Sequence, residues 1–345
     1  MTESAAEPVS LRLPAGFDVL AEDEQLASEV FTALGQVEER LMEALSSSDE
    51  LANVSARYLA EAGGKRIRPL LTILTSLLGD GPDVRVREAA AVMEMTHLAT
   101  LYHDDVMDSA PVRRGAPAAH QVWGNSVAIL TGDVILARAS QLMSQMGAEG
   151  TRVQATTFER LVMGQLHETV GPAEAEDPKA HYLSVVADKT GSLVAAASRL
   201  GALFGGCTSE VADMLEGYGE AVGVAFQLAD DVIDLTSDGA TSGKTPGTDL
   251  REGVPTLPVL LLREQAAQGD QHAAEVLLLV EGDLSGDEAL AEAVAAVVAH
   301  PVTEESWEVA RSWSRRAGEA LTALPESTIK DALLSFAEAV VARES

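Results

Sequence analysis

The chain has 345 residues and a formal net charge of −30, from 54 acidic and 24 basic side chains. A chain this acidic lacks the basic surface that nucleic acid needs, and on average it is repelled by anionic membranes. Its single cysteine, Cys207, excludes an intramolecular disulfide framework and a cysteine-based zinc site. Cysteine usage of this kind is typical of a reducing compartment, so we expect a cytoplasmic location.

Residues 1–20 show no clear periodicity and contain Pro8, Pro14 and Gly16, so we expect a flexible N-terminal arm. They lack the basic stretch followed by an apolar stretch that a signal peptide would have. No run of about eighteen apolar residues occurs in the sequence, so we expect no transmembrane helix.

From residue 23 onward the chain has the pattern of successive amphipathic helices. In residues 23–46, apolar side chains recur at intervals of three and four from Leu26 to Leu45. Similar patterns cover residues 51–61, 67–79, 83–108, 118–146, 150–169, 178–203, 209–236, 255–268, 271–280, 285–298, 303–323 and 326–343. Because no shift in composition marks a boundary, we expect an all-α fold, with a single helical bundle over residues 21–345.

A glycine turn followed by cations precedes one of these helices, at residues 63–69. Lys65, Arg66 and Arg68 fall at the start of the helix, where the helix dipole disfavours positive charge. Backbone N–H groups at a helix start bind phosphate, and nearby cations strengthen that binding. The segment therefore predicts a phosphate site.

Two Asp-Asp-x-x-Asp motifs each end a strongly apolar helical stretch, at residues 104–108 and 230–234. On a helix the first and last aspartates of each motif share a face, and Asp105 and Asp231 are rotated from that face by about 100°. Crowded carboxylates near apolar surface are unfavourable unless cations neutralise them. Carboxylate oxygens suit Mg²⁺, which also binds substrate phosphates. The alternatives are a solvated acidic helix end and a general acid–base pair.

Polar residues near these motifs could hold a diphosphate. They are His97, Arg113, Arg114, Lys189, Thr190, Gln227 and Lys244. The two arginines follow the first aspartate motif and carry planar guanidinium groups that bind phosphate oxygens in pairs. Taken singly each of these signals is weak, since a lone helical histidine such as His97 is more often structural.

Together these residues resemble the trans-polyprenyl diphosphate synthase family, in order along residues 23–345. The likeness is densest at residues 63–69, 97–115, 132–133, 189–190, 226–234 and 243–258. It implies the all-α isoprenoid synthase bundle around a central cavity, usually as a homodimer. It also implies an enzyme that condenses an allylic diphosphate with isopentenyl diphosphate.

The resemblance also implies roles for individual residues. Isopentenyl diphosphate would be held by Lys65, Arg68, His97 and Arg114. Mg²⁺, with three ions when substrate is bound, would be ligated by Asp104, Asp108 and Asp230 and supported by Asp105, Asp231 and Asp234. The allylic diphosphate would be held by Arg113, Lys189, Thr190, Gln227 and Lys244. Val254 stands where many relatives have a lysine, which puts one diphosphate contact in doubt.

Product length depends, by the same resemblance, on side chains just before the first aspartate motif. Relatives that stop early have bulky aromatics where this chain has Ala99 and Thr100. Small residues here favour a long product of about 30–50 carbons, as in bacterial heptaprenyl to nonaprenyl synthases that make quinone side chains. Phe158 is a candidate for the floor of the product tunnel, although the simpler interpretation, that it is a core residue, is favoured. A geranylgeranyl or farnesyl diphosphate synthase is the alternative.

Other classes remain open. His103 and Asp104 resemble the His-Asp pair of helical metal-dependent phosphohydrolases, but the remaining histidines show no clear ligand spacing. A non-catalytic subunit of a heteromer would usually lose aspartates, and all six are present. A terpene cyclase of the same fold would not need the cations Lys65, Arg68 and Arg114 for a second diphosphate.

Overall fold

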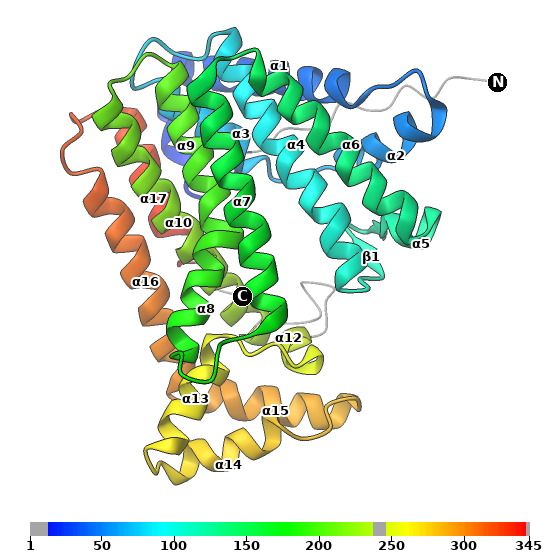
Figure 1. Cartoon of the computed structure of the whole chain (residues 1–345). Helices are drawn as coiled ribbons and strands as arrows, with labels where there is room; N and C mark the ends of the chain where they lie inside the picture. Colours follow the sequence, from blue (N-terminus) through cyan, green and yellow to red (C-terminus); the bar gives the residue numbers. More distant parts are fainter. Residues whose placement is uncertain (1–12, 237–245, 343–345) are drawn as a thin grey trace. The chain divides into compact units, whose positions relative to one another are not determined.

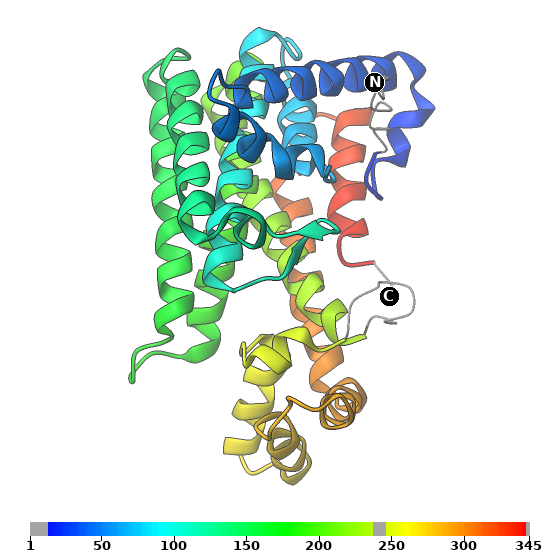
Figure 2. The ribbon, with the colours of Figure 1, turned by 90° about the vertical axis from the view of Figure 1, so that its right-hand side faces the viewer.

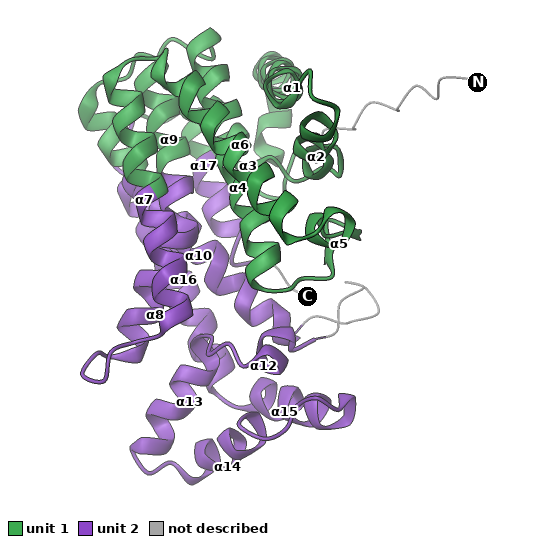
Figure 3. Ribbon diagram, turned by 45° about the vertical axis from the view of Figure 1, so that its right-hand side comes forward, with its two compact units in different colours: residues 1–158, 196–216, 325–332 green, residues 159–195, 217–324, 333–345 purple. Residues whose placement is uncertain are grey.

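A computed structural model describes residues 13–236 and 246–342, which are almost entirely helical (Figure 1). The chain forms two compact units, each assembled from three segments (Figure 3). Unit 1 takes in the described parts of residues 1–158, 196–216 and 325–332, and unit 2 those of 159–195, 217–324 and 333–345. The all-α prediction is confirmed, and the expectation of one domain over residues 21–345 stays a prediction.

Unit 1 contains most of the N-terminal elements. They are η1 (Asp18–Glu22), α1 (Glu24–Leu45), α2 (Glu50–Glu61), α3 (Ile67–Ser76), α4 (Val84–Met107), β1 (Val112–Arg113), β2 (Ala116–Pro117), α5 (Ala119–Trp123) and α6 (Asn125–Ser144). Unit 2 contains α8 (Pro178–Val186), η2 (Ala187–Gly191), α12 (Thr248–Glu252), α13 (Leu257–Ala267), α14 (Gln271–Val280), α15 (Asp287–Ala299) and α16 (Val302–Ala320). Residues of both units occur in α7 (Ala148–Val170), α9 (Ser192–Phe204), α10 (Ser209–Thr236) and α17 (Thr328–Ala339).

Helix α4 is the centre of unit 1, and it ends in the first aspartate motif. It packs against α1, α3 and α6 (Figure 1), and residues 89–93 have no solvent-exposed surface. A helix that is apolar on all sides is stable only when neighbours surround it. At its start, the side chain of Asp83 accepts a hydrogen bond from the Val86 N–H and caps the helix.

The expected N-terminal arm is docked over part of its length. Phe17 and Leu20 have no exposed surface, and η1 begins at Asp18. Burying two large apolar side chains removes this stretch from solvent, so these residues belong to the packed part of unit 1. The arm before residue 13 lies outside the described residues.

Two local features differ from the predicted helices of unit 1. The stretch 118–146 is divided into α5 and α6 at Gly124, whose φ of 82° does not fit a right-handed helix. Before it, β1 and β2 form a short antiparallel hairpin that the helical periodicity did not predict. The Tyr58 hydroxyl donates a 2.8 Å hydrogen bond to the Pro117 carbonyl and ties this hairpin to α2.

The core of unit 2 forms where α13 packs against α8, α14 and α16, and α15 packs against α14 and α16 (Figure 2). Leu257, Leu262 and Leu290 are almost fully buried in this cluster. The predicted helix over 178–203 contains a π-helical turn at Ala187–Gly191, which periodicity cannot reveal.

Helix α6 is unusual because much of its apolar surface is exposed. Ile129 is 42% exposed, Leu130 61% and Val134 37%. By length and composition, α6 is the one helix of the described residues that could span a membrane, with a third of its apolar window buried. The expectation of no transmembrane helix therefore stays a prediction.

Candidate active site

The first aspartate motif lies where α4 ends. Asp104 is partly buried, Asp105 has no exposed surface, and Asp108 caps the C-terminus of α4 and is exposed. The Arg113 Nε donates a 2.6 Å hydrogen bond to Asp105 Oδ1, whereas Asp105 Oδ2 is buried with no hydrogen-bond partner among the described residues. Burial raises the pKa of Asp105, and Arg113 opposes that shift. This motif therefore has a buried carboxylate oxygen available for a cation.

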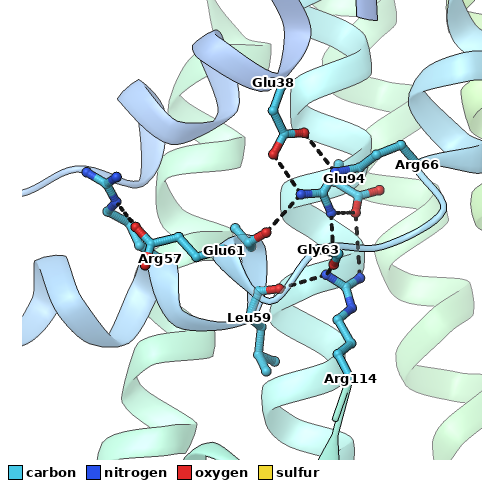
Figure 4. Close-up of polar contacts among 9 residues, drawn as sticks. Glu38, Arg57, Leu59, Glu61, Gly63, Arg66, Glu94 and Arg114 are labelled. Atoms are coloured by element: carbon cyan, nitrogen blue, oxygen red, sulfur yellow. Dashed lines mark hydrogen bonds and ion pairs between the residues drawn. The ribbon is translucent and has the colours of Figure 1, made fainter. Parts of the chain in front are cut away.

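The glycine turn before α3 is held by a buried ion-pair cluster that sequence reasoning missed (Figure 4). Arg66 donates two 2.8 Å hydrogen bonds to Glu38 and one of 2.9 Å to Glu94. Its NH2 group also donates to the Ala60 carbonyl at 2.9 Å. The prediction that Arg66 belongs to a phosphate site is wrong, because two carboxylates within the protein, Glu38 and Glu94, already neutralise its charge.

Arg114 from the β-hairpin reaches the same turn (Figure 4). It donates a 2.7 Å hydrogen bond to the Leu59 carbonyl and a shorter one to the Gly63 carbonyl. Gly64 has φ 153°, and a Cβ atom there would lie 3.0 Å from the Arg114 guanidinium, so only glycine permits this approach. Arg114 thus ties the α2–α3 turn to the segment that follows the first aspartate motif.

Positive charge gathers around His97 in unit 1. Burial lowers the pKa of His97 well below its usual value, and the charges of Arg68 and Arg114 lower it further. The pKa of Arg68 is also lowered, chiefly by burial, and its Nε has no hydrogen-bond partner among the described residues. Buried cations that the protein does not fully neutralise indicate an anion site.

The second aspartate motif sits near the end of α10 in unit 2, at the end of a hydrogen-bonded chain. The Thr190 hydroxyl donates to Gln227 Oε1 at 3.0 Å, and the Gln227 amide donates to Asp231 Oδ1 at 2.8 Å. The Tyr182 hydroxyl donates a short bond to the other oxygen of Asp231. Burial raises the pKa of Asp231 to about 6, and the bonds from Tyr182 and Gln227 oppose that shift. Asp231 therefore orients Gln227 and Thr190, and its support of a Mg²⁺ site stays a prediction.

The outer aspartates of this motif are partly exposed. Asp234 accepts a 3.2 Å hydrogen bond from the Asp249 N–H, which fastens the start of α12 to the end of α10. Lys189 forms a 2.5 Å ion pair with Glu168. Lys244 lies outside the described residues, so its predicted role stays a prediction. Val254, for which the resemblance raised the loss of a lysine contact, is 38% exposed.

Each unit gathers one group of the predicted residues. Unit 1 contains Lys65, Arg68, His97, Ala99, Thr100, Asp104, Asp105, Asp108, Arg113, Arg114 and Phe158. Unit 2 contains Lys189, Thr190, Gln227, Asp230, Asp231 and Asp234. Within each unit, a carboxylate motif therefore occurs together with groups able to bind phosphate.

Side chains predicted to set product length differ in exposure. Ala99 has no exposed surface, whereas Thr100 and Phe158 are partly exposed. The Thr100 hydroxyl donates a 2.8 Å hydrogen bond to the His97 carbonyl within α4. Thr100 is therefore the better of the two α4 positions for a substitution that adds bulk.

Three positioning groups were not found from the sequence. Glu94 carried a signal, because it is an isolated acid in an apolar helical run, three residues before His97. Glu38 and Tyr182 carried none, since polar residues are common on one face of an amphipathic helix. Their roles depend on partners far away in the sequence.

Known proteins resemble this chain over most of its length. The sequence profile described as polyprenyl synthetase matches residues 49–297. Nonaprenyl diphosphate synthase of Mycobacterium tuberculosis is 45% identical over 323 residues, which cover 93% of this chain and 95% of that protein. The chain belongs to the polyprenyl synthetase family.

Solved structures of the family have the same fold. Polyprenyl synthase from Caulobacter crescentus, complexed with calcium and isoprenyl diphosphate, matches with a TM-score of 0.85 at 30% identity, covering 97% of this chain and 100% of that chain. Geranylgeranyl pyrophosphate synthase from Corynebacterium glutamicum, also complexed with calcium and isoprenyl diphosphate, matches at 0.82 and 42% identity, covering 92% and 97%. The predicted family and isoprenoid synthase fold are confirmed, which favours a prenyltransferase over a phosphohydrolase.

The lowered pKa of His97 in this polyprenyl synthetase family member predicts a pH-dependent stability. In the unfolded chain His97 takes up a proton below about pH 6.5, whereas in the folded chain its lowered pKa keeps it neutral to a lower pH. The unfolded state then binds more protons, so stability falls as the pH falls below about 6.5, by at most about 1.4 kcal/mol per pH unit.

The variant His97→Gln should lose this contribution. Urea unfolding at about pH 7.5 and about pH 5.5 measures the effect, and the wild type should lose more stability than the variant over that interval. An equal loss in both proteins would contradict the buried, neutral state of His97.

Proposed function

We propose that this chain is a Mg²⁺-dependent trans-polyprenyl diphosphate synthase that condenses an allylic diphosphate with isopentenyl diphosphate. One observation supports the proposal most strongly. Each of the two units contains one aspartate motif together with side chains that can bind phosphate. In unit 1 these groups include Arg68, whose buried Nε has no hydrogen-bond partner among the described residues. A protein that binds a single diphosphate would need only one aspartate motif with phosphate-binding side chains, whereas this chain has two.

Divalent metal fits the donors that the chain offers. The carboxylates are hard oxygen ligands, and the buried Asp105 Oδ2 lacks a donor among the described residues. Within residues 13–236 and 246–342, no three His, Cys, Asp or Glu side chains converge on one metal position. Mg²⁺ binds through one or two carboxylates and completes its shell with water and substrate phosphates. Asp104 and Asp108 in unit 1 and Asp230 in unit 2 would be the carboxylate ligands of the Mg²⁺ ions, and bound Mg²⁺ would offset the charge that builds on the departing diphosphate.

The other residues bind and orient the substrates in this proposal. Lys65, Arg68 and Arg114 hold the isopentenyl diphosphate as charge partners. The C–O bond of the allylic diphosphate breaks, the isopentenyl double bond forms a new C–C bond, and the departing diphosphate accepts the released proton. The Thr190 hydroxyl and the Gln227 amide, fixed by Asp231, present oxygen dipoles to the allylic cation.

Incubation of the purified protein with Mg²⁺, isopentenyl diphosphate and a series of allylic diphosphates tests this function. We expect elongated products, and Asp104→Asn should lower kcat/KM by about 100-fold or more because a metal ligand is lost. Asp331→Asn, which changes an exposed aspartate on α17, is the matched control and should retain activity. Failure to elongate every allylic primer would contradict the proposal.

We also propose a long product of the heptaprenyl to nonaprenyl class. The likeness to nonaprenyl diphosphate synthase and the small side chains of Ala99 and Thr100 support this length. Thr100→Phe should shorten the main product, because an aromatic ring in place of this small, partly exposed side chain would block the path of the growing prenyl chain. Chromatography of dephosphorylated products measures the change. An unchanged product distribution in an active variant would contradict the role of this position.

A second copy of this chain is the partner that we propose for the exposed face of α6. Ile129, Leu130 and Val134 form an apolar stripe on a 20-residue helix, and stable dimers bury such stripes against each other. Leu130→Glu should therefore convert a dimer into a monomer in light scattering. Leu278→Glu, at a 75% exposed leucine on α14, is the control and should leave the mass unchanged. A wild-type monomer, or a Leu130→Glu dimer, would contradict this interface.

A further inference from the structure

A π-helical turn presents two of the five residues assigned to the allylic diphosphate. Lys189 and Thr190 lie in η2, between α8 and α9. The Ser192 N–H closes the turn by donating to the Ala187 carbonyl, five residues earlier. A π turn is less stable than an α turn and persists where neighbours fix it, frequently at functional sites. The contacts that fix η2 therefore decide where these two residues point.

Arg160 of α7 makes two of those contacts and a third bond to α10. Its Nε donates to Asp188 Oδ1 at 2.7 Å, its NH1 to Glu220 Oε2 at 2.7 Å, and its NH2 to the Ala187 carbonyl at 3.4 Å. One guanidinium thus joins α7, the π turn and α10. The two carboxylates raise the pKa of Arg160 against the opposing effect of its burial, so the charge is permanent. A lysine could not match this planar set of bonds.

The helix α7 approaches the turn along one face, at intervals of four residues. Arg160 is followed by Gly164, where a Cβ atom would lie 2.9 Å from the Lys189 backbone nitrogen and 3.1 Å from Asp188 Cβ. Glu168 comes next and forms the ion pair with the Lys189 side chain. Spacing of four places all three residues on the same side of the helix. Helix α7 therefore contacts both the side chains and the backbone of the π turn.

We propose that Arg160 is a positioning residue of the synthase, which holds the π turn in place so that Lys189 and Thr190 meet the allylic diphosphate. The proposal rests on the function proposed above. It assigns Arg160 no contact with substrate, because its guanidinium is occupied by Asp188, Glu220 and the Ala187 carbonyl. It also explains a glycine within α7, where glycine otherwise destabilises a helix.

Steady-state kinetics of Arg160→Met and Arg160→Lys test this role. Both should raise KM for the allylic diphosphate, Arg160→Met by about tenfold or more and Arg160→Lys by less, with KM for isopentenyl diphosphate within about twofold of wild type. Hydrogen exchange over residues 187–192 should also accelerate in Arg160→Met, because the turn loses its clamp. A purely structural role would not separate the two KM values.

Arg199→Met is the matched control, because Arg199 likewise joins Asp213 and Glu216 but makes no bond to the π turn. It should leave the allylic KM and the exchange of residues 187–192 unchanged. If Arg160→Met shifts both KM values equally, shifts neither, or behaves like Arg199→Met, the positioning role is wrong. If the wild type itself forms no product, the proposed function fails instead.

A second pair of variants avoids the unpaired carboxylates that Arg160→Met leaves behind. Gly164→Ala pushes a methyl group into the π turn and should raise the allylic KM selectively. Gly217→Ala, at a helical glycine on α10 with no atom within 4 Å of the new methyl group, should leave it unchanged. A normal allylic KM in folded Gly164→Ala would overturn the claim that α7 sets the position of the turn.

Discussion

A buried arginine must keep all of its acidic and carbonyl partners, and this constraint fixes the loops on which the site depends. Arg66, which is buried, satisfies it with Glu38 and Glu94. Removing one partner from a buried pair costs about 3–5 kcal/mol, because the remaining charge stays buried. Arg160 is partly exposed, so its pairs with Asp188 and Glu220 are weaker, but they join the π turn to α7 and α10 in the same way.

The two clusters have corresponding tasks in the two units. In unit 1, Arg66 orders the turn that carries Lys65 and leads to Arg68, and Arg114 adds bonds from the β-hairpin. In unit 2, Arg160 orders the turn that carries Lys189. In both units, the arginine that orders the turn, Arg66 or Arg160, is neutralised by carboxylates of the protein itself. Cations next to them, such as Arg68, remain available to an anion, which is how a chain with net charge −30 can bind diphosphates.

Much of the fold and the chemistry could be predicted from the sequence, because periodicity and short motifs are local signals. The helices, both aspartate motifs and the cations of residues 63–69 belong to this group. The inward orientation of Arg66 could not be predicted, since Glu38 lies 28 residues away on another helix. The π turn and the break at Gly124 also escaped, because one inserted residue or one positive φ barely changes an apolar pattern.

We propose that one chain binds two diphosphates, one through metal and one through cations. Equilibrium binding of isopentenyl diphosphate and an uncleavable allylic thiolodiphosphate measures the two sites separately. We expect one of each per chain at the same time, with the allylic analogue released on chelation of Mg²⁺ because bare carboxylates repel it. Isopentenyl diphosphate should remain bound through Lys65, Arg68 and Arg114. Mutual competition for one site per chain would rule out two separate diphosphate sites.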